Sequence, residues 1–236
     1  MHACLQLAMR LLLAFGLLLP SGAWAARTAF QVRCEDDMGK TVTMLTAQQS
    51  GYTIDSDLSY RALTRMRGEN RPNTYVLGLT RTESRVEIAL AGPLLQDAAS
   101  GYECVAPQIS VKLFYVPVVI YIGSEFPPGG CPYQAILKHE LRHLKAYMDH
   151  LPKVETLARA ALARRFEAKP LYAPAGTARL ALEHEINTGW LPYIKAEMGK
   201  VELQQAVIDS PEEYGRLANS CNGEIKNIIV PSRRSH

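Results

Sequence analysis

The sequence has no apolar run long enough to cross a bilayer as a helix, and it carries little excess charge of either sign. A helical span takes roughly 20 apolar residues. Lys and Arg number 26 against 23 Asp and Glu, a formal net charge of +3, which is too small to indicate nucleic acid binding. A Gly-rich phosphate loop and a GxSxG nucleophile motif are also absent. We therefore expect no nucleic acid partner and no stable membrane insertion of the mature chain.

The remaining composition is that of a globular protein. The chain has 236 residues, of which 47% are hydrophobic and 21% charged. This length gives one or two domains and suffices to bury a core. Collagen-like, low-complexity and wholly disordered chains are excluded.

The N-terminus has the pattern of a cleaved export signal. Arg10 precedes a short apolar core, Leu11–Leu19, which Pro20 and Gly22 interrupt before the small residues of Ala23-Trp24-Ala25. We interpret residues 1–25 as a signal peptide cleaved after Ala25, with a periplasmic or secreted location. An N-terminal membrane anchor is the alternative, disfavoured because the apolar core is short.

Four cysteines follow the expected cleavage point: Cys34, Cys104, Cys131 and Cys221. An even number in an oxidising compartment favours two disulfides, with three possible connectivities. No Cys-x-x-Cys pair is present, which disfavours a cysteine-only zinc site. We predict Cys34–Cys104 and Cys131–Cys221, because this pairing keeps each bond within one half of the chain.

The two halves differ in character and predict an α+β fold. Residues 26–130 are β-rich: 86–90 alternate apolar and polar residues, and 75–79 alternate similarly, so the two segments are expected to form a hairpin. We interpret this half as a small antiparallel sheet. The second half, 131–230, is expected to be a helical metal-binding subdomain, followed by a disordered tail at 231–236.

Breakers and caps divide the helical half. The pattern predicts helices over 133–148 and 154–167, separated at Pro152, and a third helical stretch over 177–206, kinked near Pro192 and Gly199. Ser210-Pro211 indicates another helix start, with Ser210 as the N-cap and Pro211 at the first helical position.

The first of these helices carries His139-Glu140-Leu141-Arg142-His143, an HExxH pentapeptide. Histidines four residues apart lie on one helical face, so both imidazoles can reach one Zn²⁺ ion. Glu140 can reach a water on that ion and act as general base.

At these residues the chain resembles the zincin metallopeptidases, and its order of sheet then helices resembles the gluzincin-like members. The resemblance covers the pentapeptide and this layout. It implies that His139 and His143 are zinc ligands, that Glu140 is the catalytic base, and that a later helix supplies the third ligand. It also implies that the strand 118–122 binds the substrate backbone.

We expect the third ligand to come from the helix that contains Glu183 and His184. We take the apolar positions of this helix, Leu180 among them, as its buried face. At about 100° per residue, Glu183, His184 and Asn187 then lie close to that face. Glu183 followed by Asn187 resembles the gluzincin arrangement, with Asn in place of an acid. We expect Glu183 as the ligand, with His184 or another residue as alternatives.

Two functions fit these features. The first is an exported zinc-dependent hydrolase, a metallopeptidase acting on protein or on peptidoglycan peptides, with Glu140 as general base. The second is a non-catalytic periplasmic binding protein on a zincin-like scaffold.

Overall fold

The computed structural model describes residues 27–38, 41–69 and 72–229. The expected signal peptide, residues 1–25, and the expected tail, 231–236, lie outside the described residues. Within the described part, helices and strands are mixed along the chain, which confirms the α+β class. None of the described helices combines the length and apolar composition that a bilayer crossing needs.

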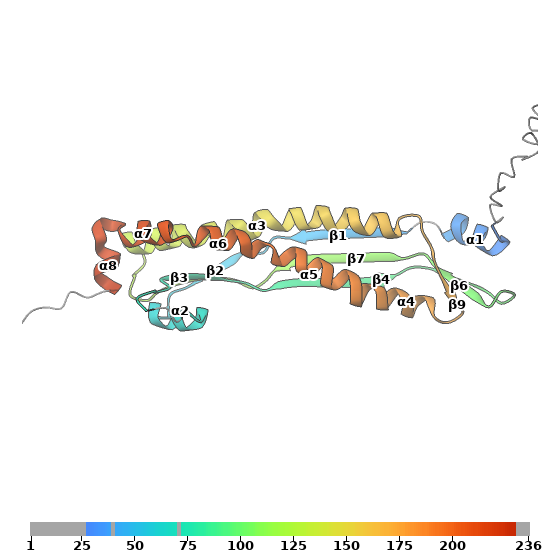
Figure 1. Ribbon diagram of the computed structural model, residues 1–236, viewed down its shortest axis with the longest axis horizontal. Coiled ribbons are helices and arrows are strands. Elements are labelled where there is room, and N and C mark those ends of the chain that lie inside the picture. Colours follow the sequence, from blue (N-terminus) through green and yellow to red (C-terminus); the bar gives the residue numbers. More distant parts are fainter. Residues whose placement is uncertain (1–26, 39–40, 70–71, 230–236) are drawn as a thin grey trace, which may run out of the picture.

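A long three-stranded ribbon forms the centre of the molecule. It consists of two sheets placed end to end (Figure 1). The first has the order β1-β7-β4 and the second β2-β8-β3. Their bounds are β1 (Val42–Gln48), β2 (Tyr52–Asp55), β3 (Gly78–Arg81), β4 (Ser84–Ala91), β7 (Gln108–Tyr115) and β8 (Val118–Ile122). The chain passes directly from β1 to β2, from β3 to β4 and from β7 to β8. β7 and β8 are the central strands of the two sheets.

The pairing within this ribbon differs from the antiparallel sheet that we expected. β1 and β2 run parallel to β7 and β8, whereas β4 and β3 run antiparallel to them. The expected hairpin between 75–79 and 86–90 does not form, because β3 pairs with β8 and β4 with β7. Residues 82–83 continue the chain from one sheet into the other. Alternation indicated strands correctly, but it does not specify their partners.

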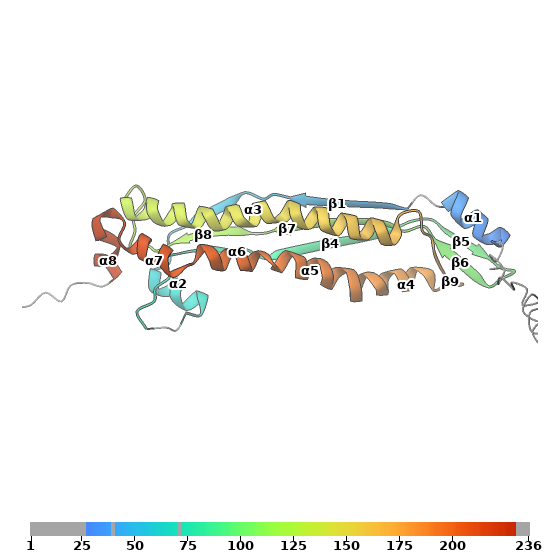
Figure 2. The same cartoon turned by 45° about the horizontal axis from the view of Figure 1, so that its top comes forward.

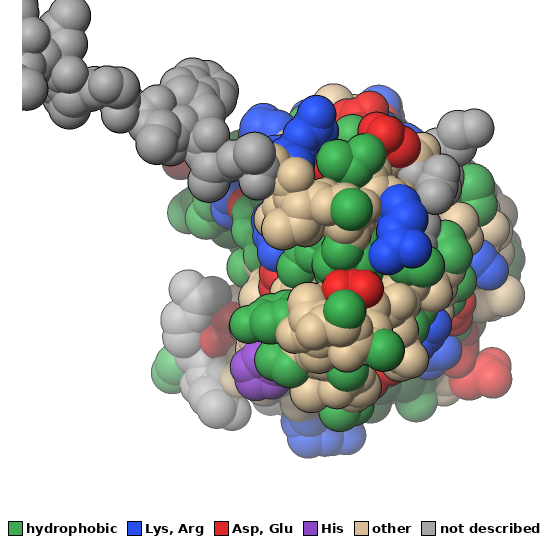
Figure 3. Space-filling view, turned by 90° about the vertical axis from the view of Figure 1, so that its right-hand side faces the viewer, with side chains coloured by type: hydrophobic (Ala, Val, Ile, Leu, Met, Phe, Trp, Pro, Cys, Tyr) green, Lys and Arg blue, Asp and Glu red, His purple; other side chains and the backbone are tan. Residues whose placement is uncertain are grey.

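A third, antiparallel sheet lies at the end of the molecule remote from α7 and α8 (Figure 1). It has the order β5-β6-β9, with β5 (Leu94–Asp97), β6 (Tyr102–Val105) and β9 (Leu171–Pro174). Helix α1 (Ala29–Met38) is bound to it through Cys34 and Cys104. In the end-on view of Figure 3, hydrophobic side chains at this end are interspersed with basic and acidic ones.

A helical layer covers one side of the ribbon (Figure 2). Helix α3 (Cys131–Phe166) has 36 residues, about 54 Å at 1.5 Å per residue. Beside it the chain returns through α4 (Ala178–Glu185), the π-helix η1 (Ile186–Trp190), α5 (Leu191–Gly199) and α6 (Val201–Ile208). The remaining helical segments are α2 (Tyr60–Arg67), α7 (Pro211–Ala218), η2 (Cys221–Gly223) and α8 (Glu224–Ile229).

The expected break at Pro152 is wrong, since Pro152 lies inside α3. Proline removes one backbone donor and strains the preceding turn. Here the turns on both sides are anchored by burial: Leu151, Val154 and Ala158 all belong to the main core with the sheet. This packing maintains one continuous helix. The stretch expected as one helix over 177–206 is divided: the π turn of η1 comes just before Pro192, and α5 ends at Gly199 before α6 begins.

The two predicted disulfides, Cys34–Cys104 and Cys131–Cys221, are both present. The second joins the first residue of α3 to η2, near the C-terminal end of the described chain. Two disulfides are compatible with an exported protein.

Candidate metal centre

Helix α3 presents His139, Glu140 and His143 toward the ribbon end formed by β3. All three side chains are buried. The two imidazole rings lie on one face with centroids 4.9 Å apart, as the four-residue spacing predicts.

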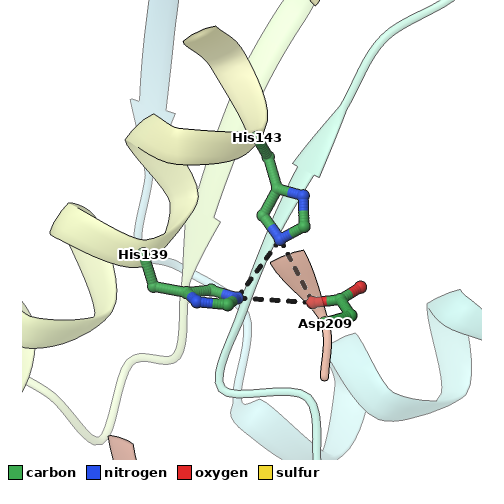
Figure 4. Close-up of side chains that lie close together, drawn as sticks. All are labelled: His139, His143 and Asp209. Carbon is green, nitrogen blue, oxygen red and sulfur yellow. Dashed lines mark hydrogen bonds and ion pairs between the residues drawn. The ribbon is translucent and has the colours of Figure 1, made fainter. Parts of the chain in front are cut away.

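Asp209 completes a cluster with the two histidines (Figure 4). It follows the last residue of α6 and immediately precedes Ser210, whose hydroxyl accepts a hydrogen bond from the Glu213 backbone N–H at 3.2 Å. The N-cap predicted at Ser210 is therefore confirmed. This cap begins α7 in a direction that leaves Asp209 facing α3.

The distances between three atoms of the cluster, one from each residue, match those between the ligand atoms of a tetrahedrally coordinated metal ion. Asp209 Oδ1 lies 3.1 Å from His143 Nε2 and 3.3 Å from His139 Nε2, and the two Nε2 atoms are 3.2 Å apart. Zinc bonds to nitrogen and oxygen are about 2.0–2.1 Å. Tetrahedral bonds of that length place ligand atoms about 3.3 Å from one another. The two imidazoles and the carboxylate are therefore a group that could hold one metal ion.

Glu183, the expected third ligand, is not part of this cluster; Asp209 is the acidic residue that lies beside the two histidines. Glu183, His184 and Asn187 are all exposed on α4 and η1. The helical phase was misjudged because Leu180, taken as buried, is 63% exposed, whereas Leu182 is buried. The sequence does place Asp209 in a turn, directly before the helix start at Ser210-Pro211. It does not indicate which residues that turn faces.

The outer nitrogens of both imidazoles are also engaged. His139 Nδ1 lies 3.1 Å from Glu213 Oε1, and His143 Nδ1 lies 2.5 Å from Gln205 Oε1. Since these oxygens can only accept, each Nδ1 donates to its partner. Each Nε2 is then the ring nitrogen left to bind a metal, in place of the proton that it can share with Asp209 Oδ1 in the metal-free fold.

Charges around the cluster favour a deprotonated Asp209. Burial by itself would raise its pKa, but the hydrogen bonds from His139 and His143, and the charge of Arg67, hold the pKa of Asp209 well below its usual range. Arg67 Nη2 lies 2.8 Å from Asp209 Oδ2. For His139, burial opposes the charged form, but Asp209, Glu140 and Glu213 together raise its pKa above the ordinary value.

Glu140 points from α3 to β3 instead of into the ligand triangle. The Thr80 hydroxyl lies 2.9 Å from Glu140 Oε2 and 3.0 Å from its backbone carbonyl oxygen. Burial raises the pKa of Glu140 despite the opposing effect of the two histidines. A carboxylate with a raised pKa beside an ion site is suited to accept and release a proton.

The cavity beside the cluster is lined by β3 and by no residue of 118–122, the strand expected to bind substrate. Val118–Ile122 is β8, the central strand of its sheet, and its two edges are already paired. β3 pairs only with β8 among the described strands, and residues 76–80 line the same cavity as His139, Glu140 and His143. β3 is therefore a strand beside the cluster with one edge not paired to any described strand.

Comparisons with family models, curated proteins and solved structures find no match to this chain. The function has to be inferred from the chemistry of the cluster.

Proposed function

We propose that the protein is an exported zinc-dependent hydrolase, a metallopeptidase that cleaves peptide bonds in proteins or in peptidoglycan peptides. The observation that carries the proposal is the triangle of His139 Nε2, His143 Nε2 and Asp209 Oδ1, with sides of 3.1 to 3.3 Å, beside a buried Glu140.

His139, His143 and Asp209 would hold the zinc. When bound, zinc polarises a carbonyl oxygen and lowers the pKa of a coordinated water to about 7. Gln205 and Glu213 hold the two imidazoles in the required tautomer. Mutation of such supporting groups typically costs about 10- to 100-fold in metal affinity.

Glu140 has the role of general base. Thr80 holds Oε2, so Oε1 remains to accept a proton from the attacking water and to deliver it to the leaving amine nitrogen.

Two further side chains of the cavity can interact with the carbonyl oxygen as charge develops on it. Burial and the nearby Asp209 raise the pKa of Tyr214 to about 12, so its phenol stays protonated and can donate. Arg67 lines the same cavity, and its guanidinium N–H groups can donate. Donors directed at a developing oxyanion are a large source of rate enhancement.

The edge of β3 supports a peptide substrate in particular. An extended peptide can pair with a free strand edge through its backbone alone, which does not depend on its sequence. Pairing with β3 would bring its carbonyl groups alongside the cavity that His139 and Glu140 line.

The experiment is a comparison of wild type with Glu140→Gln on quenched peptides and muropeptides. Loss of a general base costs about 10²–10⁴ in rate, whereas zinc content and melting temperature should be unchanged. Equal cleavage by the variant would refute the role of Glu140. If zinc binds but no substrate is cleaved, the protein is better described as the binding scaffold.

A further inference from the structure

A second cavity adjoins the metal centre. It has a volume of about 370 Å³ and lies between the segment leading into β3 and the helices α7 and α8. Leu77, Asp209, Tyr214 and Leu217 line both this cavity and the one beside the histidines. The two spaces are therefore neighbours that share a wall.

Among the residues that the structure describes, the lining of the second cavity has little charge. Its apolar walls come from Tyr75 before β3, Pro211 and Ala218 of α7, and Ile229 of α8. Within this described lining Asp209 is the only charged residue, and its carboxylate is already bound to Arg67 and the histidines. A charged group entering this space would lose its hydration without finding a free partner.

From this we infer that the second cavity, named here the side-chain pocket, receives a large uncharged side chain of the substrate, aliphatic or aromatic. The inference rests on the proposed function and adds the substrate class. A peptide paired with β3 directs alternate side chains to each face. One of these would enter the side-chain pocket while its neighbouring peptide bond lies at the metal centre.

The pocket walls are held by contacts remote from the metal. Cys221 bonds Cys131 and fixes the link between α7 and α8 to the start of α3. Tyr60 on α2 places its hydroxyl 3.5 Å from the Ile229 carbonyl oxygen. A pocket with fixed walls discriminates by size better than one that can collapse or expand.

The test fills the pocket from a position that does not contact the metal ligands. Ala218→Phe adds a ring toward the cavity, and Ala218→Leu adds a smaller group if the first variant folds poorly. Ala181→Phe is the matched control, because Ala181 is exposed on α4. The probes are zinc-loaded protein and a set of quenched peptides that differ at one residue: Ala, Leu, Phe, Lys or Glu.

Wild type should cleave the Leu and Phe peptides at least tenfold faster, in kcat/KM, than the Ala peptide, and the Lys and Glu peptides most slowly. Ala218→Phe should lower the Leu and Phe rates to the Ala rate and leave the Ala rate within about twofold. Ala181→Phe should behave as wild type. Absence of a Leu and Phe preference in wild type, or its persistence in both Ala218 variants, overturns the inference.

If wild type binds zinc and cleaves none of the peptides, the proposed hydrolysis has failed. The binding affinity of the peptides then tests the side-chain pocket independently of hydrolysis. The same peptides are then titrated into zinc-loaded Glu140→Gln protein. Tighter binding of the Phe peptide than of the Ala peptide by at least tenfold, lost on adding Ala218→Phe, supports the pocket. Equal affinities refute it.

Discussion

At the scale of single residues, the candidate centre depends on one carboxylate that lies far from the histidines in the sequence. Asp209 is 66 positions after His143, yet its Oδ1 is within hydrogen-bond distance of both Nε2 atoms. Glu183, the residue favoured by sequence pattern, is exposed. The two acids therefore give opposite expectations on substitution.

Asp209→Ala should remove stoichiometric zinc from the purified protein, whereas Glu183→Ala should retain it. The reason is that loss of one of three protein ligands leaves the ion with only two imidazoles. Metal analysis after gel filtration measures both. His143→Ala is the positive control for zinc loss, and zinc retained by Asp209→Ala would show that another residue completes the site.

At the scale of secondary structure elements, the centre depends on how closely β3 approaches α3. A Cβ at Gly78 would lie 2.7 Å from Ile136 Cγ2 and 2.8 Å from Glu140 Oε1. Ile136 and Glu140 are both buried, so one of them or the β3 backbone would have to shift. Glycine at this position thus allows β3 to lie this close to Glu140.

Gly78→Ala should lower kcat/KM at least tenfold while zinc content stays near wild type, because the metal ligands are not displaced. Hydrolysis of the best substrate and metal analysis test this. Gly189→Ala is the matched control, since a Cβ there meets nothing within 4 Å. An unimpaired Gly78→Ala enzyme would contradict the assigned position of Glu140.

The two disulfides should also differ in their effect on the centre. Cys131–Cys221 ties α3 to the segment after α7, whereas Cys34–Cys104 joins α1 to β6 in the third sheet. Removing either bond by paired Cys→Ser substitution should cost roughly 2–5 kcal/mol of stability. Only loss of Cys131–Cys221 should weaken zinc binding, measured by competition with a chelator below both melting temperatures. Equal weakening by both pairs would mean that the effect is not local.

At the scale of the whole molecule, the centre joins two parts of the helical layer that are distant in sequence. The histidines belong to α3, and Asp209 lies between α6 and α7. An ion that binds all three connects these helices only in the folded state. Binding to the native state alone stabilises it by mass action.

Zinc should therefore raise the melting temperature, and a chelator should lower it. At a free zinc concentration 100 times Kd the gain is about 2.7 kcal/mol. The gain should be larger at pH 8 than at pH 5.5. The pKa of His139 is raised in the metal-free fold, so its proton stabilises that fold at pH values below the ordinary pKa of histidine. This contribution is lost as the pH rises through the folded-state pKa, and zinc then no longer has to displace the proton. Calorimetry at both pH values checks this, and an identical zinc effect in His139→Ala would refute it.

Local sequence patterns were sufficient for several features of the protein. The shared helical face of His139 and His143, the cap at Ser210, the α+β class and both disulfide pairings were predictable from the sequence. The first two depend on residues within one or two helical turns, where 3.6-residue geometry relates sequence distance to spatial distance. The pairing followed the change from β-rich to helical character at about residue 130.

The third ligand candidate, the edge strand and the continuity of α3 through Pro152 were decided only by the tertiary structure. Each depends on which distant segment packs against which: Asp209 against α3, β3 against Glu140, and Leu151 and Val154 against the sheet. Periodicity identifies a buried face but does not identify its partner, and at Leu180 it indicated the wrong face. The packing of the long helical layer on a ribbon of two consecutive sheets brings these groups together, because burial of the shared core determines how the distant segments align.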